Sequence, residues 1–391
     1  MALVTTQTTR SLGRATRLLG IALASTFILA GCGGGGSSGD SPTTNRIFLA
    51  GDSLLDMGTF NGLKFTVQST AGATKIAIDH VAEAKGIKAP CSAYSSALAL
   101  ANLSCTGFAI GGGRVVSSLE TPRSIVKQLQ DMKASFTRFE ASDLVIVDGG
   151  GNDFADLAES FGAFATAAGA ARASPTPASV AAYQAATQAY ATFLAPLLQP
   201  TAWAQGPAAQ AAVVTSITTA MLTAADPSAQ AVSYGLAYSV KLADTFTKAI
   251  DENLIAAGAT RILIFNPPDI VLTPRFAPVR SLLGPLVSGW IAGYNLQLES
   301  FAAARSQVAM YDFYTKGFRF IRDPKVGASF GFTNVTDAAC LTIDASCSTA
   351  SLNVAKPEWS GYFFADGFHG TPLANKVIGT EIADQLATLG W

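Results

Sequence analysis

The hydrophobic positions along this chain gather into short runs that end at glycine and polar residues. Short apolar runs bounded by turn residues predict buried β-strands. Three runs fit this description well: 46–50, which GDS follows, 144–147, which DGGGND follows, and 261–265, which NPPD follows. A fourth run, at 308–314, fits it more weakly.

Helical periodicity fills the gaps between these runs. Apolar positions three and four residues apart predict a helix near 125–136, and Thr371 followed by Pro372 predicts the start of a C-terminal helix. Strands that alternate with helices predict an α/β fold with a mostly parallel sheet covered on both faces. Ligands bind beyond the carboxyl ends of such strands, where Ser53 and Asn152 are expected.

The segment 155–244 differs in composition from the rest of the chain. It is rich in alanine, threonine and glutamine and is interrupted by six prolines, which predicts several helices. Ser179 and Ser228 are candidate N-caps for two of them. The segment directly follows Asn152, so it is either a cap over the functional site or an ordinary helical insertion that completes the core.

The N-terminus has the features of an export signal. Three arginines precede an apolar run at 18–30 that is too short to span a bilayer, which predicts a signal peptide over 1–31. The run ends in LAGC, which resembles the lipobox of bacterial lipoproteins and makes Cys32 the expected lipid anchor. The alternative is an ordinary signal peptide with an incidental cysteine. Residues 32–44 are expected to form a flexible tether before one folded domain at 45–391.

The remaining cysteines form two local pairs, Cys91 with Cys105 and Cys340 with Cys347. In an exported protein this spacing predicts two disulfides, with four free thiols as the alternative. A metal site is disfavoured because no Cys-x-x-Cys or histidine-rich pattern accompanies them. The formal net charge is −1 and no basic run is present, which argues against a nucleic-acid partner.

The chain has two histidines, which makes the search for a catalytic base short. His80 lies in a helical pattern and is interpreted as a structural residue. His369 lies in a loop, three residues after Asp366, from which a carboxylate can orient the imidazole. Ser53, just past a strand end, is the candidate nucleophile that such a base would activate.

Four sequence blocks, in order, resemble those of the GDSL (SGNH) hydrolase family: GDSLLDMG at 51–58, GFAIGGGR at 107–114, GGND at 150–153 and DGFH at 366–369. The resemblance implies Ser53, Asp366 and His369 as the catalytic residues. It also implies an oxyanion hole made by the amides of Ser53 and Gly112, with Gly111 one step away, and by the Asn152 side chain.

The family resemblance also implies a flavodoxin-like three-layer α/β/α fold with neither metal nor organic cofactor. NPPD at 266–269, GFTNVTD at 331–337 and YFFAD at 362–366 further resemble the bacterial lecithinase/haemolysin-type esterase/lipase branch. Ala365 and Gly370 depart from that branch, which often has tryptophan and proline there. These departures bear on substrate preference.

The expected function is hydrolysis of carboxylic esters through an acyl-enzyme on Ser53, with an acyl-ester or lipid substrate. Alternatives are phospholipase or acyltransferase activity, deacetylation of an O-acetyl polysaccharide, and a non-catalytic surface-binding lipoprotein. The expected location is the bacterial cell envelope, attached to the outer membrane through the lipid anchor, with release as a secreted protein as the alternative.

Overall fold

The computed structural model describes residues 43–68, 74–116, 121–341, 345–349, 352 and 358–391. Residues 41–391 form one compact unit. The signal peptide expected over 1–31, the anchor Cys32 and most of the tether expected over 32–44 lie outside the described residues. Among the described residues, no helix combines the length and the apolar character needed to cross a lipid bilayer.

A parallel four-stranded sheet lies at the centre of the unit, with strand order β1-β2-β3-β4. Its strands are β1 (Arg46–Ala50), β2 (Asp143–Asp148), β3 (Ile262–Phe265) and β4 (Val308–Tyr311). The segment around Gly107 runs parallel to the outer edge of β1, where the Leu49 amide donates to Thr106 O and Phe108 N donates to Leu49 O. With this segment the order becomes the 2-1-3-4-5 of flavodoxin-like folds.

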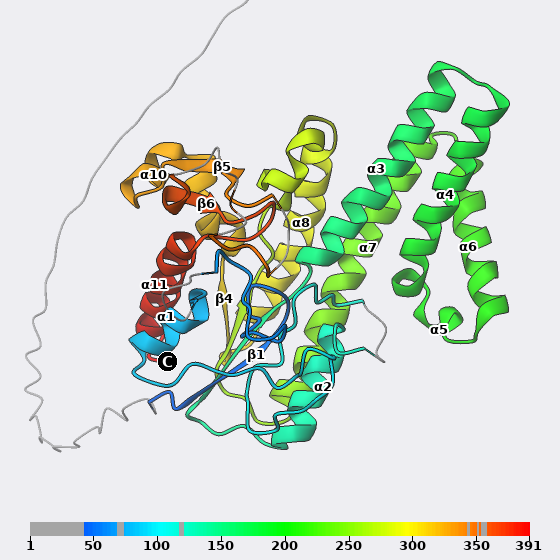
Figure 1. Ribbon diagram of the computed structural model, residues 1–391. Helices are drawn as coiled ribbons and strands as arrows, with labels where there is room; N and C mark the ends of the chain where they lie inside the picture. The colour runs from blue at the N-terminus through cyan, green and yellow to red at the C-terminus, as the bar shows by residue number, and fades with distance from the viewer. Residues whose placement is uncertain (1–42, 69–73, 117–120, 342–344, 350–351, 353–357) are drawn as a thin grey trace, which may run out of the picture. The chain divides into compact units, whose positions relative to one another are not determined.

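Helices cover both faces of the sheet, so alternate side chains of each strand enter different cores. Phe48 and Val145 pack against α2 (Ile125–Phe136), α7 (Pro227–Ile250) and α8 (Arg280–Ala303). Leu49 and Ile146 pack on the other face, against α1 (Ala77–Ala84) and α11 (Pro372–Thr388) (Figure 1). Burial on both faces explains why these strands are almost wholly apolar. The predicted three-layer α/β/α fold is confirmed.

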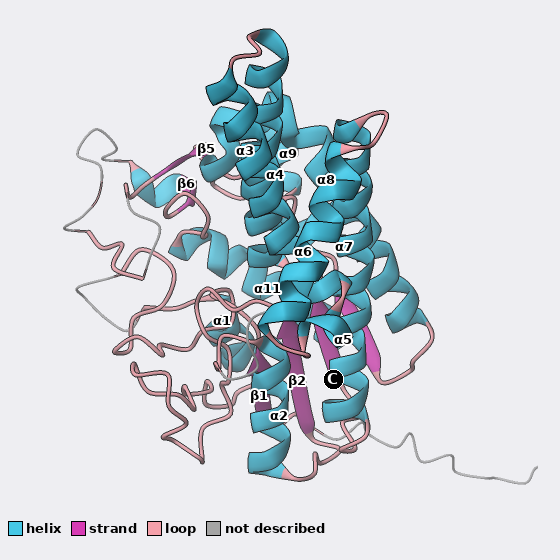
Figure 2. Ribbon diagram, turned by 90° about the vertical axis from the view of Figure 1, so that its right-hand side faces the viewer, coloured by secondary structure: helices cyan, strands magenta, loops and turns pink. Residues whose placement is uncertain are grey.

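The segment predicted to be helical folds into four long helices and one short helix, joined by short turns. The long helices are α3 (Gly151–Ala173), α4 (Pro177–Leu198), α6 (Pro207–Leu222) and α7, and the short one is α5 (Pro200–Trp203). Figure 1 places α4 and α6 outside α3 and α7, away from the sheet, and Figure 2 looks onto the molecule from that side. The caps expected at Ser179 and Ser228 are wrong, because Thr176 and Asp226 cap α4 and α7. Both helices begin earlier than expected, because each has a proline as its first residue, Pro177 in α4 and Pro227 in α7. The first helical position suits proline, since an N–H group there would have no partner within the helix.

The C-terminal third carries the short elements that lead to the last helix. Thr371 caps α11, as its sequence predicts, by accepting a hydrogen bond from Ala374 N. Before it, β5 (Asn334–Ala338) and β6 (Tyr362–Phe364) form a separate two-stranded parallel sheet, which the hydrophobic pattern did not predict. The other short elements are η1 (Asp251–Ile255), η2 (Ile270–Leu272), η3 (Pro274–Val279), η4 (Phe313–Gly317), α9 (Arg319–Arg322), α10 (Pro324–Ser329) and η5 (Trp359–Gly361).

Candidate active site

Ser53 lies in a tight turn at the carboxyl end of β1. Gly51 begins the turn with φ of 153°, and a Cβ atom there would lie 1.5 Å from Asp148 Oδ1. Glycine is therefore required for the close approach of β2. The next amide, Asp52 N, donates to the same Asp148 oxygen at 2.7 Å, which fixes the turn that presents Ser53.

His369 and Asp366 come from the loop between β6 and α11. Asp366 Oδ1 accepts hydrogen bonds from the backbone amides of Phe368 and His369, at 2.7 and 2.8 Å. Its other oxygen lies 2.8 Å from His369 Nδ1, and His369 Nε2 lies 2.8 Å from Ser53 Oγ. The fold thus joins the three side chains that the sequence singled out into one hydrogen-bonded chain.

The environment of His369 favours its protonated form. Burial alone would lower the pKa of the imidazole, but the charge and hydrogen bond of Asp366, together with the charge of Asp52, raise the pKa above its usual value. The Asp366 side chain is fully buried. A charge in such a low-dielectric position acts strongly on its neighbour, so an imidazolium formed during a reaction is stabilised.

The glycines at 111–113 have different hydrogen-bonding roles. Gly111 N donates to Asp56 Oδ2 at 2.8 Å, and Gly113 N donates to Ile110 O at 2.9 Å. Neither Gly112 N nor Ser53 N has an acceptor among the described residues. Gly112, with φ of 75°, is in the left-handed region that glycine favours. These contacts favour Gly112 over Gly111 as an amide donor for a ligand.

Asn152 lies in the first turn of α3 and lines the same cleft as Ser53. Its Nδ2 atom lies 3.0 Å from Gly113 O and 3.3 Å from Asp52 Oδ2. The first contact anchors the amide to the glycine loop. The second is long for a hydrogen bond, so it is the contact that a ligand oxygen would replace.

Two buried acids near the site order the glycine loop. Asp56 accepts from Gly111 N as well as from the amides of its own turn. Asp153 accepts from Val115 N and Val116 N, and burial raises its pKa to about 7. Both acids therefore hold backbone amides of this loop in place.

Two cavities adjoin Ser53. An open cleft of about 440 Å³ contains Ser53, Gly112, Asn152 and His369. A narrower cavity of about 50 Å³ lies among the ends of the strands and includes Asp148 and Phe265. The side chains at the nucleophile face the open cleft, so a substrate has room to approach there.

Of five phenylalanines that lie near the sequence blocks, two line the open cleft. These are Phe60 and Phe368. Phe108, Phe154 and Phe364 are fully buried core residues. The cleft also contains Phe65, whose ring centroid lies 5.0 Å from that of His369. Sequence reasoning missed Phe65, because it lies outside the four blocks.

The helical insertion contributes no described residue between 155 and 244 to either cavity. Two acids of α3 form ion pairs at the edge of the site: Glu159 with Arg275, which lines the cleft, and Asp156 with Arg114, which donates to Gly112 O. The segment therefore meets the site through these ion pairs and not through the lining of either cavity.

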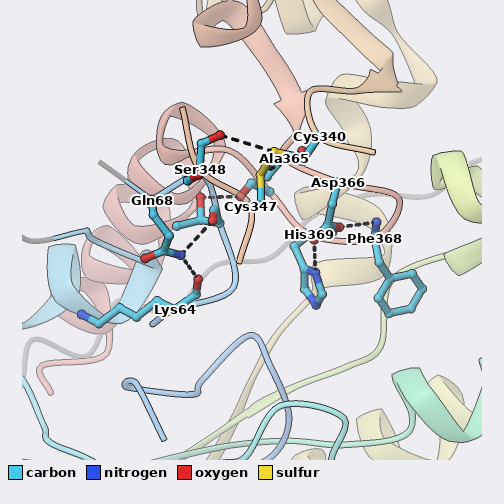
Figure 3. The surroundings of a disulfide bond; sticks show 11 residues. Lys64, Gln68, Cys340, Cys347, Ser348, Ala365, Asp366, Phe368 and His369 are labelled. Atoms are coloured by element: carbon cyan, nitrogen blue, oxygen red, sulfur yellow. Dashed lines mark hydrogen bonds and ion pairs between the residues drawn. A yellow bond between two sulfur atoms is a disulfide. The ribbon is translucent and has the colours of Figure 1, made fainter. Parts of the chain in front are cut away.

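Both predicted disulfides are present, Cys91–Cys105 and Cys340–Cys347. The second contacts the loop that carries Asp366 and His369 (Figure 3). Cys340 N donates to Ala365 O at 2.6 Å, and the same oxygen lies 3.5 Å from Cys347 Sγ. Within the described part of the chain, no group of three or more histidine, cysteine or acidic side chains is arranged to hold a metal ion.

Comparison with known families adds to this geometry. Residues 47–216 match the family described as GDSL-like lipase/acylhydrolase. No curated protein matches the chain. The match supports a hydrolase of the esterase/lipase kind with the SGNH α/β hydrolase fold.

The GDSL-like match covers only part of the site. It includes Ser53, Gly112 and Asn152 and ends within α6, before Asp366 and His369. The structure nevertheless brings this later loop to the nucleophile, across 316 positions of sequence between His369 and Ser53. The candidate site is thus assembled from the matched segment and from the C-terminal loop.

Proposed function

We propose that this protein is a serine hydrolase of carboxylic esters that works through an acyl-enzyme on Ser53. The observation that carries the proposal is the hydrogen-bonded chain Ser53–His369–Asp366, with 2.8 Å at each of its two links. A hydroxyl, an imidazole and a buried carboxylate in this order are the groups needed to activate a nucleophile.

In the first half-reaction Ser53 Oγ attacks the ester carbonyl carbon while His369 Nε2 takes the hydroxyl proton. Asp366 holds the ring through Nδ1 and stabilises the imidazolium. The carbonyl oxygen becomes an oxyanion that accepts hydrogen bonds from Ser53 N, Gly112 N and Asn152 Nδ2. His369 then gives its proton to the leaving alcohol oxygen as the C–O bond breaks.

In the second half-reaction His369 removes a proton from water, and the resulting hydroxide attacks the acyl carbon. The oxyanion forms again in the same site. When it collapses, the carboxylic acid leaves and Ser53 recovers its proton from His369. An alcohol that replaces water at this step would give acyl transfer from the same intermediate.

The test compares the full-length protein with Ser53→Ala on p-nitrophenyl esters from acetate to palmitate. We expect hydrolysis by the wild type and nearly complete loss in the variant, with an unchanged melting temperature. Formation of new esters when alcohol is added would identify transfer. A folded wild-type protein that hydrolyses none of the esters, and whose Ser53 does not react with a fluorophosphonate, would contradict the proposal and favour a binding lipoprotein.

We also propose that the protein is exported and attached through Cys32 to the bacterial outer membrane. The apolar run at 18–30 supports export, and the LAGC sequence supports a lipid anchor at Cys32. Gly33, in place of an aspartate, supports the outer membrane as the location. The two disulfides agree with an oxidising compartment. Expression in a bacterium with labelled palmitate tests the anchor: label and membrane association should be lost in Cys32→Ser. Equal association of both forms with the membrane fraction would contradict it.

A further inference from the structure

The open cleft beside Ser53 carries positive charge. Arg123 and Arg275 both line it, and none of the described residues that line it is acidic. The remaining wall near the nucleophile is largely apolar, with Phe60, Leu63 and Phe65. A cleft of this kind combines a surface for hydrocarbon with a site for an anion.

Arg123 is held in a defined position next to the glycine loop. Its carbonyl oxygen accepts from Arg114 N at 2.9 Å, which ties its backbone to that loop. Its guanidinium carbon lies 5.6 Å from the centroid of the Phe60 ring. A Cβ atom on Gly112 would lie 2.6 Å from Arg123 Nη1, so the guanidinium lies directly against the glycine assigned to the oxyanion hole.

The two arginines of the cleft differ in their partners. Arg275 forms an ion pair with Glu159, and nearby Arg114 pairs with Asp156. Arg123 is half-buried, and its side chain has neither an ion pair nor a hydrogen bond with any described residue. A partly desolvated guanidinium with unused donors binds an anion strongly, because both charge and directional hydrogen bonds contribute.

We propose that Arg123 forms a subsite for a negatively charged group, a phosphate or a carboxylate, on the ester that this enzyme cleaves. The inference rests on the proposed ester hydrolysis and names its substrate class: acyl esters that carry an anion within reach of the reacting carbonyl. In such a complex the anion accepts the guanidinium hydrogen bonds while the apolar wall contacts the hydrocarbon part.

The test uses three esters with one acyl group and closely similar alcohols. They are 1-butanoylglycerol, which is neutral, 1-butanoylglycerol 3-phosphate and 3-O-butanoylglycerate. We expect the wild type to have a higher kcat/KM for at least one anionic ester than for the neutral ester. The preferred anion distinguishes a phosphate from a carboxylate source, and the preference should weaken as salt is added.

Three variants separate recognition from other roles. Arg123→Gln should lower the anionic-to-neutral ratio of kcat/KM by about ten-fold or more, the size of a lost charge-assisted interaction. Arg123→Lys should restore part of the ratio because it keeps the charge. Arg172→Gln removes a charge from an exposed position at the end of α3, away from the cleft, and should leave the ratio unchanged.

The ester hydrolysis and the anion subsite are tested by different results of these experiments. Hydrolysis of the neutral ester that is lost in Ser53→Ala establishes the esterase whatever Arg123 does. The subsite is overturned if Arg123→Gln lowers all three activities equally, which would indicate a role in the oxyanion hole or in folding. It is also overturned if the wild type shows no preference for either anionic ester. Matching melting temperatures for the variants exclude misfolding as the cause of a changed ratio.

Discussion

Asp52 and Asp148 lie together below the nucleophile, joined by the 2.7 Å hydrogen bond from Asp52 N to Asp148 Oδ1. Both carboxyl groups are almost completely buried. Burial, and then the charge of Asp52, raise the pKa of Asp148 well above its usual value. Asp148 Oδ2 accepts no hydrogen bond from any described donor, so no hydrogen bond stabilises a negative charge on that oxygen.

The raised pKa of Asp148 makes folding depend on pH. Its contribution to stability is fully present below the unfolded-state pKa, near 3.8, and is lost as the pH rises through the folded-state value. Asp148→Asn keeps an oxygen for Asp52 N and removes the titrating carboxyl group. We therefore expect its melting temperature, relative to wild type, to increase from pH 5 to pH 9.

Asp148→Ala serves as the comparison. It leaves Asp52 N without its acceptor and should be about 1–3 kcal/mol less stable than Asp148→Asn, which also lacks the titrating carboxyl group, at all of these pH values. A melting-temperature difference between Asp148→Asn and wild type that stays constant with pH would show that Asp148 does not hold its proton in the folded protein.

The pH dependence of activity should reflect the pKa of His369. The free enzyme needs a neutral imidazole as base, and the pKa of His369 is raised, so the acidic limb of kcat/KM should lie above pH 6.5. Asp366→Asn removes the main interactions that raise this pKa. We expect the limb to move to lower pH and kcat to fall on the order of 10⁴-fold. An unshifted limb in a folded variant would mean that another group sets it.

Asn152 should contribute mainly to the transition state. Loss of one oxyanion donor in Asn152→Ala should lower kcat by about 10² to 10³-fold with a smaller effect on KM. Because Asn152 also contacts Asp52 and Gly113, the melting temperature must be measured alongside. Full activity in a folded variant would remove Asn152 from the oxyanion hole.

The two disulfides should differ in their effect on catalysis. Either one should cost about 2–3 kcal/mol of stability when both of its cysteines become serine. Cys340–Cys347 contacts Ala365, next to Asp366, whereas Cys91–Cys105 lies at the far edge of β1. We expect the first double variant to lose more kcat, measured below both melting temperatures. Equal losses would show that the loop is positioned without its disulfide.

Much of the fold follows from local rules that the sequence displays directly. The buried strands before Gly51 and Gly149 are apolar runs that end at turn residues. Thr371 and Pro372 begin a helix because threonine caps the first free amides and proline suits the first helical position. The four blocks, with Ser53 and His369 in them, can likewise be read residue by residue. Each of these features depends on neighbours within a few positions of the chain.

Other features depend on contacts between segments remote in sequence, and only the tertiary structure decided them. Asp56 accepts a hydrogen bond from the Gly111 amide, whereas the Gly112 amide has no acceptor among the described residues. The three consecutive glycines of the sequence give no sign of this difference. No described residue of 155–244 lines either cavity at Ser53, although the position of this segment in the chain places it directly after Asn152. Arg123 reaches the cleft because Arg114 and Phe60 hold it there. The sequence by itself determined the local elements and the chemical groups, whereas long-range packing decided which donors and charges face the substrate.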